Sequence, residues 1–147
     1  MTRRYWDACA FLAWLKEENG RIQGCGNVLR EARAGRLEIV TSALTLAEVL
    51  MVRGEAQVPE SDRQLVRDVF KAEWLILYNV DRHIGEHAQE IVWRNGVRPK
   101  DAIHVATALS AGVDCLDTFD GPLINLSGRI GTPPLMICEP QIDGQLC

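Results

Sequence analysis

The sequence contains no apolar run that approaches the roughly 18 residues needed to cross a membrane. It also contains no low-complexity tract, no collagen-like period and no internal repeat. Near the N-terminus, Asp7 interrupts a short apolar stretch, and Lys16 follows that stretch where a signal peptide would carry small residues. These absences argue against a membrane protein, a fibrous protein and a secreted precursor. We therefore expect a protein of the cytoplasm with no membrane partner.

Cysteine patterns that would indicate disulfides or zinc are missing as well. The five cysteines are odd in number and include no C-x-x-C pair and no zinc-ribbon spacing. Free thiols in a reducing compartment are the simplest interpretation.

The overall composition is that of an ordinary globular domain. The chain has 147 residues, of which 47% are hydrophobic and 24% charged. Its formal net charge of −4 does not by itself indicate nucleic-acid binding. Basic residues are unevenly placed, however, with one group at 30–36 and another that includes Arg98 and Lys100. These groups are either solvated helix faces or phosphate contacts, and the sequence leaves both interpretations open.

Hydrophobic periodicity and turn residues predict alternating strands and helices. The expected strands cover 3–6, 37–41, 74–78, 114–118 and 135–138, and the expected helices cover 8–16, 22–34, 42–53, 61–72, 81–95 and 99–111. Such alternation is typical of an α/β fold with three layers, α/β/α, around a central, mainly parallel five-stranded sheet. We expect one domain at 1–138 and a polar C-terminal tail at 139–147.

Four acidic residues fall at the edge of this sheet where parallel strands end. Asp7 follows the first strand, Glu48 lies early in the helix after the second, and Asp120 follows the fourth. Asp101 is in the first turn of the helix that leads into the fourth strand, and that helix must begin at the same edge. Ligands bind at this edge in open α/β sheets. An acid at each of these junctions is therefore a candidate site.

Each acid also has a purely structural explanation. Asp7 would make a good helix N-cap, and Thr45 with Glu48 has the spacing of a capping box. Asp101 would interact favourably with a helix dipole, and Asp120 before Gly-Pro could be a turn residue. The coincidence of all four at one edge favours the functional interpretation.

Carboxylates gathered at one place repel one another, and a divalent cation relieves this repulsion. A like-charged pair at 4 Å costs about 4 kcal/mol at an effective dielectric of 20. A ligand set of oxygen atoms without His or Cys selects Mg²⁺ or Mn²⁺ over zinc. On a phosphodiester, such ions activate a water and neutralise charge on the scissile phosphate.

Four segments of the chain resemble the PIN domain, and most closely the toxins of VapBC toxin–antitoxin pairs. They are YWDACAFLAWL at 5–15, TSALTLAEVL at 41–50, RPKDAIHVATAL at 98–109 and DCLDTFD at 114–120. The resemblance implies a metal-dependent RNA endonuclease with Asp7, Glu48, Asp101 and Asp120 as ligands of Mg²⁺ or Mn²⁺. It also implies Thr118 as a hydroxyl neighbour of the site, an RNA substrate, a cognate antitoxin and a homodimer.

Two positions depart from the family pattern. A hydroxyl residue is common shortly after the first aspartate, but this chain has Cys9 and Ala10 there. Asp117 replaces the apolar residue that is usual on the fourth strand, so it is a possible fifth metal ligand. Next to Asp101, we expect Arg98 and Lys100 to contact substrate phosphates.

Histidines support two other hypotheses. His83, Glu86 and His87 match the H-x-x-E-H zinc-protease motif, although a solvated helix face explains them better. His104, three residues after Asp101, is more often a hydrogen-bonded structural residue than a catalyst.

Three functions therefore remain open at the level of sequence. The first is a toxin ribonuclease, and the second is a PIN-like nuclease that processes nucleic acid without an antitoxin. The third is a non-catalytic binding module with the same fold. The acids present at all four positions argue against the third, because a pure binding module does not need them.

Overall fold

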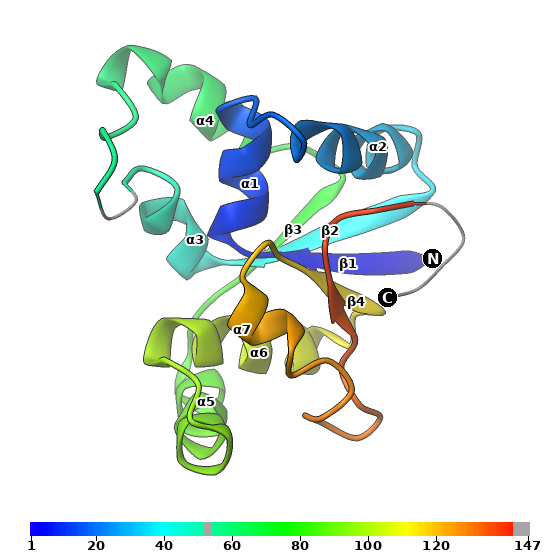
Figure 1. The fold of residues 1–147 in the computed structure, drawn as a ribbon. Coiled ribbons are helices and arrows are strands. Elements are labelled where there is room, and N and C mark those ends of the chain that lie inside the picture. Colours follow the sequence, from blue (N-terminus) through cyan, green and yellow to red (C-terminus); the bar gives the residue numbers. More distant parts are fainter. Residues whose placement is uncertain (52–53, 143–147) are drawn as a thin grey trace.

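The computed structural model describes residues 1–51 and 54–142 (Figure 1). The elements in chain order are β1 (Thr2–Trp6), α1 (Ala8–Leu15), α2 (Ile22–Arg33), β2 (Leu37–Ser42), α3 (Ala43–Glu48), a 3₁₀ turn (Glu60–Asp62), α4 (Arg63–Phe70), β3 (Leu75–Tyr78), α5 (Arg82–Asn95), α6 (Pro99–Ala111), β4 (Cys115–Asp117), α7 (Gly121–Ile124) and β5 (Ile137–Cys138).

The five strands form one sheet in the order β3-β2-β1-β4-β5, and all four neighbouring pairs are parallel. Helices α1, α2 and α4 cover one face of the sheet, and α5, α6 and α7 cover the other (Figure 1). The prediction of a three-layer α/β/α fold with a parallel five-stranded sheet is confirmed. Because β1 is central and pairs with both β2 and β4, three strand ends that carry candidate acids are neighbours.

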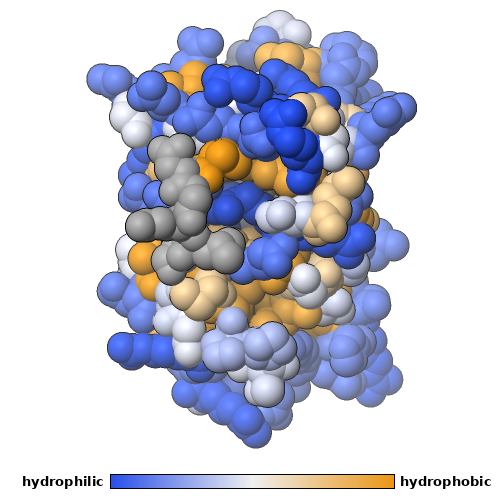
Figure 2. All heavy atoms as spheres, turned by 90° about the vertical axis from the view of Figure 1, so that its right-hand side faces the viewer, coloured by the Kyte–Doolittle hydropathy of each residue, from blue (hydrophilic) through white to orange (hydrophobic). Residues whose placement is uncertain are grey.

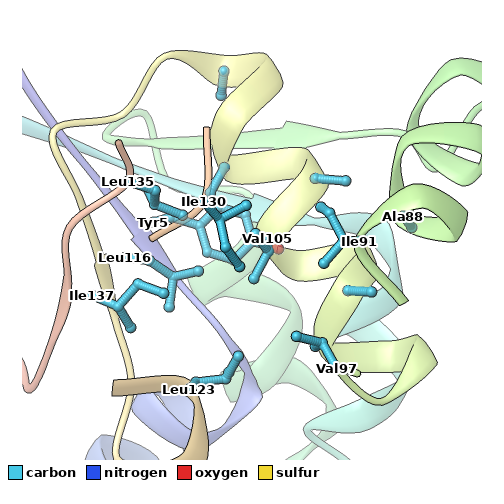
Figure 3. Close-up of a cluster of buried hydrophobic side chains, with 14 of the residues drawn as sticks. Tyr5, Ala88, Ile91, Val97, Val105, Leu116, Leu123, Ile130, Leu135 and Ile137 are labelled. Carbon is cyan, nitrogen blue, oxygen red and sulfur yellow. The ribbon is translucent and has the colours of Figure 1, made fainter. Parts of the chain in front are cut away.

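Each face of the sheet has its own hydrophobic core. On one face, Tyr5, Leu116 and Ile137 from the strands pack with Ile91 of α5 and Val105 of α6 (Figure 3). On the other face, Trp6 and Ile39 pack with residues of α1, α2 and α4. Tyr5 and Trp6 therefore lie on opposite faces, as the two-residue period of a strand requires.

Local signals explain where the helices next to the site begin and end. The carboxylate of Asp7 accepts a hydrogen bond from the N–H of Ala10, so the predicted N-cap of α1 is confirmed. Helix α6 has Pro99 in its first turn and ends at Gly112, whose φ of 63° lies in the left-handed region. The bounds predicted for this helix, 99–111, match the structure.

Two elements near the site differ from expectation. Helix α3 ends at Glu48 although apolar spacing suggested a helix to 53, and residues 52–53 lie outside the described part. The spacing was misleading because Leu46 and Leu50 are half-exposed and do not form a core stripe. The Gly-Pro sequence after Asp120 is not a simple turn, since it opens the short helix α7.

The capping box suggested for Thr45 and Glu48 is wrong. Ser42 is the N-cap of α3, because its hydroxyl accepts a hydrogen bond from the N–H of Leu44. The hydroxyl of Thr45 instead accepts a hydrogen bond from Thr41, and both side chains are buried. The Glu48 carboxylate is thereby left available for another role.

The face shown in Figure 2 is the one that lies on the right-hand side of Figure 1. This side of the molecule is mostly hydrophilic, with apolar patches between polar residues (Figure 2). Of the tail expected at 139–147, residues 143–147 lie outside the described part; Pro140 is buried, and its carbonyl oxygen lies against Gly24 of α2. Across the described ranges, no helix is both long and apolar enough to span a membrane. Cys9 and Cys25 are free thiols as expected, whereas Cys138 is disulfide-bonded, so that expectation does not hold for the whole chain.

Candidate active site

The four acids singled out in the sequence lie on four different elements at the carboxyl edge of the sheet. Asp7 joins β1 to α1, and Glu48 is the last residue of α3, which follows β2. Asp101 is in the first turn of α6, and Asp120 is the N-cap of α7 just beyond β4. Starts of α1, α3 and α7 meet at this edge in the ribbon view (Figure 1).

Asp7 is the most deeply buried of the four and has no positively charged hydrogen-bond partner. One carboxylate oxygen accepts from the N–H of Ala10 at 3.2 Å, and the other accepts from the hydroxyl of Thr118 at 2.6 Å. Burial raises its pKa from 3.8 to about 6, although these hydrogen bonds and the nearby His104 oppose the rise. An ionised Asp7 is therefore costly until a cation arrives.

Thr118 links two of the acids. Its hydroxyl donates to Asp7 and accepts from the backbone N–H of Asp120 at 3.1 Å. The carboxylate of Asp120 accepts in turn from the N–H of Leu123 at 3.3 Å, which fixes its orientation. The accessory position predicted for Thr118 therefore agrees with its contacts.

Asp101 and Asp120 share a single cationic side chain. Nε of Arg98 lies 3.3 Å from Asp101 Oδ2, and Nη2 of the same guanidinium lies 3.8 Å from Asp120 Oδ1. Burial and then repulsion by Asp120 raise the pKa of Asp101, while Arg98 opposes the rise. Since 75% of the Arg98 side chain is exposed, this guanidinium can move toward solvent or a ligand. Lys100 is exposed in the first turn of α6.

Glu48 is held by a partner that the sequence did not reveal. Its Oε1 lies 2.6 Å from Nε2 of His104, and the other ring nitrogen lies 2.6 Å from the hydroxyl of Tyr5. Tyr5 and His104 are almost completely buried. The i, i+3 spacing of Asp101 and His104 placed the histidine on the site side of α6, but no sequence signal identified Glu48 as its partner.

Cys9 takes the place where the family commonly has a hydroxyl. Burial, followed by the negative charges of Asp7, Asp120 and Asp101, raises the pKa of its thiol to about 12. The thiol therefore stays protonated at neutral pH.

Asp117 does not join this group. Its carboxylate accepts from Nε of Arg4 at 2.8 Å and from the indole N–H of Trp6 at 2.9 Å, and its second oxygen pairs with Nη2 of Arg4. Cys115 and Cys138 lie with Asp117 in a group of metal-ligating residue types, but Arg4 already supplies the positive charge there. The contacts of Asp117 are those of a structural ion pair.

The donor set at the sheet edge fits a hard divalent cation. It consists of carboxylates, and one of them, Asp7, is buried without a counter-charge. In the described ranges, no three of the four acids bring ligand atoms within 4.8 Å of one another. Glu48 is turned to His104, and Asp101 and Asp120 are turned to Arg98. Binding of one ion by all four acids would therefore require these side chains to turn away from His104 and Arg98.

The H-x-x-E-H motif lacks the geometry of a zinc site. His83 and Glu86 are exposed on α5, and Glu86 pairs with Arg82 one turn earlier. Among the described residues, none of the three belongs to a group that could hold a metal ion.

Comparisons with known proteins agree with this architecture. The sequence profile of the PIN domain matches residues 4–138. A crystal structure of Mycobacterium tuberculosis VapC20, titled a Sarcin-Ricin loop cleaving toxin, is similar with a TM-score of 0.60 and 16% identity, over 80% of this chain and 90% of that chain. A toxin–antitoxin complex from Klebsiella pneumoniae is similar with a TM-score of 0.62 and 17% identity, over 95% of this chain and 99% of that chain. No curated protein matches the chain in sequence. At these identities the structural likeness establishes the fold.

Proposed function

Because the chain belongs to the PIN domain family, we propose that it is a metal-dependent endoribonuclease and the toxin of a toxin–antitoxin pair. The observation that carries the proposal is the buried, uncompensated Asp7 at the centre of an edge that also holds Glu48, Asp101 and Asp120. A binding surface without catalysis would gain nothing from an uncompensated carboxylate, because its burial destabilises the fold. Both structural neighbours carry toxin names, which supports the same proposal.

In this proposal, Asp7, Glu48, Asp101 and Asp120 hold Mg²⁺ or Mn²⁺. The bound ion would supply Lewis-acid chemistry that makes a water a better nucleophile and neutralises charge on the phosphate. Thr118 keeps the Asp7 carboxylate oriented, and the backbone N–H of Leu123 does the same for Asp120. Three of the acids sit at helix starts, where backbone dipoles also favour negative charge.

Arg98 and Lys100 are the candidates for binding the RNA backbone. Both are exposed at the start of α6, and Arg98 already lies beside two of the acids. When an ion neutralises Asp101 and Asp120, the guanidinium loses its partners and is free to pair with a phosphate.

The test of the proposed function is cleavage of structured RNA by the purified protein. EDTA should abolish cleavage, and Mn²⁺ or Mg²⁺ should restore it while zinc does not. Asp7→Asn purified in the same way is the control for a contaminating nuclease. Cleavage that persists fully in EDTA, or equally in the Asp7→Asn protein, would contradict the proposal.

An apolar groove next to α3 supports an antitoxin as partner. It has a volume of about 710 Å³ and lies between α3, α4 and the edge strand β3. Its lining includes the apolar side chains of Leu46, Leu50 and Phe70 together with the cationic Arg67 and Lys71. We propose that an apolar antitoxin segment with flanking acidic residues occupies it, as the toxin–antitoxin title of one neighbour suggests.

Co-expression with a small acidic protein encoded beside the gene tests this partner. Leu50→Asp should abolish co-purification and leave RNA cleavage intact, whereas Trp93→Asp, at an exposed apolar residue of α5 outside the groove, adds the same single negative charge and should change neither. If Leu50→Asp co-purifies as well as wild type, the groove is not the docking site. If no neighbouring protein co-purifies with the wild type, the protein is better described as a PIN-like nuclease without an antitoxin. Homodimerisation remains a prediction, which light scattering after gel filtration measures.

A further inference from the structure

Three buried or half-buried side chains form a hydrogen-bonded row from the core to the site. The hydroxyl of Tyr5 lies 2.6 Å from Nδ1 of His104, and Nε2 of His104 lies 2.6 Å from Oε1 of Glu48. Tyr5 is fully buried and His104 is 2% exposed, whereas 19% of the Glu48 side chain is exposed. The row therefore connects a dry interior to a carboxylate that reaches solvent.

Hydrogen-bonding capacity fixes the direction of these bonds. An ionised carboxylate only accepts, so the hydrogen between His104 and Glu48 must be carried by Nε2. In an uncharged imidazole the other nitrogen then accepts, and the Tyr5 hydroxyl is its donor. The pKa of Tyr5 is raised well above 10, first by burial and then by Asp7, so this hydroxyl keeps its proton.

Glu48 needs an external partner because its own helix holds it poorly. Helix α3 has six residues, and Glu48 is the last of them. Thr45 and Val49 anchor the buried side of this helix, whereas Leu46 and Leu50 on either side of Glu48 are about 40% exposed, so Glu48 itself lies toward the surface. Helix α6 has 13 residues, and seven of them are buried. A side chain on α6 is therefore a firm anchor for one on α3.

His104 also shares its helix with another acid of the site. Asp101 lies one turn earlier on α6, on the same face as His104. A hydrogen bond from His104 thus places Glu48 relative to Asp101, although the two acids belong to elements 53 positions apart in the sequence. Only Oε1 of Glu48 is used in this bond, so the second oxygen remains available to an ion.

On the premise of the proposed metal-dependent activity, we infer that His104 is a positioning residue: its Nε2–H holds the Glu48 carboxylate in register with Asp101 for the metal ion. Because its hydroxyl donates to Nδ1 of His104, Tyr5 favours the ring tautomer that carries the hydrogen on Nε2. Outer partners of metal ligands typically change metal affinity 10- to 100-fold when they are removed.

Two substitutions of His104 by an amide residue distinguish a role in positioning Glu48 from a purely structural role in the core. In His104→Gln the side-chain amide reaches the place of Nε2 and can donate to Glu48. In His104→Asn the amide takes the place of Nδ1, which keeps a partner for Tyr5 but does not reach Glu48. A structural role predicts that Asn replaces His at least as well as Gln does.

We expect the Kd for Mn²⁺, measured by electron paramagnetic resonance of free Mn²⁺, to rise about tenfold or more in His104→Asn. In His104→Gln it should stay within about threefold of wild type, and the melting temperatures of the two metal-free variants should be similar. Equal Mn²⁺ affinity in all three proteins, or equal losses in Gln and Asn, would overturn the inference. A wild type that neither binds Mn²⁺ nor cleaves RNA would overturn the proposed function itself.

Nitrogen NMR of the wild-type protein supplies a test that needs no variant. The chain has three histidines, and the exposed His83 on α5 serves as the internal reference. The ring of His104 should carry its hydrogen on Nε2, with a bonded, unprotonated Nδ1. A ring protonated on Nδ1 alone would overturn the inference even if the variants do not fold.

Discussion

Asp7 and Asp117 are both buried carboxylates at the ends of neighbouring central strands, but only one of them has a cation of its own. Asp117 is paired with Arg4 through both of its oxygens and also accepts from Trp6. Asp7 is held only by a hydroxyl and a backbone N–H. The fold thus satisfies one charge internally, and under the proposed function an ion from solution would satisfy the other.

Strand geometry explains how two carboxylates at the ends of paired strands come to differ. Arg4 and Trp6 lie on the same side of β1, and the register pairs Arg4 with Cys115 and Trp6 with Asp117. Asp117 therefore meets two donors across the sheet. Asp7 is one residue beyond β1, where the chain turns into α1, and within the described part of the chain its hydrogen bonds come from Ala10 and Thr118 and not from an Arg or Lys.

The largest effect should come from breaking the internal pair. Arg4→Met leaves Asp117 charged and buried, and we expect a loss of about 3–5 kcal/mol in the free energy of unfolding. The double variant Arg4→Met, Asp117→Leu should recover most of this loss, since it removes both charges. Urea denaturation measures both proteins. A loss below about 1 kcal/mol for Arg4→Met would mean that Arg4 contributes little to compensating the charge of Asp117. Asp117 and Asp7 would then not differ in this respect.

Adding an ion should have the next largest effect, and only at the other carboxylate. At a Mn²⁺ concentration 100 times Kd, wild type should gain about 2.7 kcal/mol of stability, and Asp7→Asn much less. Asp117→Asn is the matched control: it is less stable than wild type from the start, but should keep its gain from Mn²⁺. Thermal unfolding with and without the ion shows the difference. Equal gains in stability from Mn²⁺ in wild type and Asp7→Asn would show that Asp7 is not a metal ligand.

Without metal, Asp7→Asn should be more stable than wild type above pH 7. The rise of the Asp7 pKa from 3.8 to about 6 already includes the opposing effect of its hydrogen bonds and corresponds to at most about 3 kcal/mol. Because the folded protein binds the extra proton between these two values, wild-type stability falls as pH rises from about 4 through 6. The difference between the proteins should therefore vanish near pH 4, as denaturation at several pH values would show. A difference in stability that stays constant with pH would mean that it arises from packing and not from the charge of Asp7.

The smallest effect concerns the exposed cation beside the acids. Arg98→Ala with Lys100→Ala should reduce the slope of log K for RNA against log salt by between about 1 and 2. Arg98→Ala alone should tighten Mn²⁺ binding a few-fold, since it removes a competing charge from Asp101 and Asp120. Arg36→Ala with Arg82→Ala removes as much charge elsewhere and serves as control. An unchanged slope would identify Arg98 and Lys100 as solvated surface residues.

The architecture could be predicted because its signals are local. Gly112, Pro99 and Asp7 marked helix ends correctly, and the alternation of strands and helices determined the parallel sheet. The rule that strand ends and helix starts share an edge then brought four distant acids together. Helix α3 was overextended because apolar spacing does not distinguish a core stripe from the wall of a groove.

The partners of the acids could not be predicted, because they depend on packing between distant segments. The bond between His104 and Glu48 requires α6 to lie beneath the end of α3, and that of Arg4 with Asp117 requires the register of β1 with β4. The sequence alone does not show whether an aspartate at the end of a strand is available to a metal ion or is paired with an arginine. Only the three-dimensional neighbours separate the two.

The hydrogen bond from Thr118 to Asp7 spans 111 positions of the chain, and this separation has a consequence during protein synthesis. A growing chain that ends before β4 already contains Asp7, Glu48 and Asp101, but β1 still lacks one of its two neighbours in the sheet. The last acid, together with the hydroxyl that orients the first, emerges only when four-fifths of the chain has been made. We expect ribosome-bound chains halted before β4 to cleave no RNA, so that the proposed nuclease activity would begin only after translation of the chain is nearly complete.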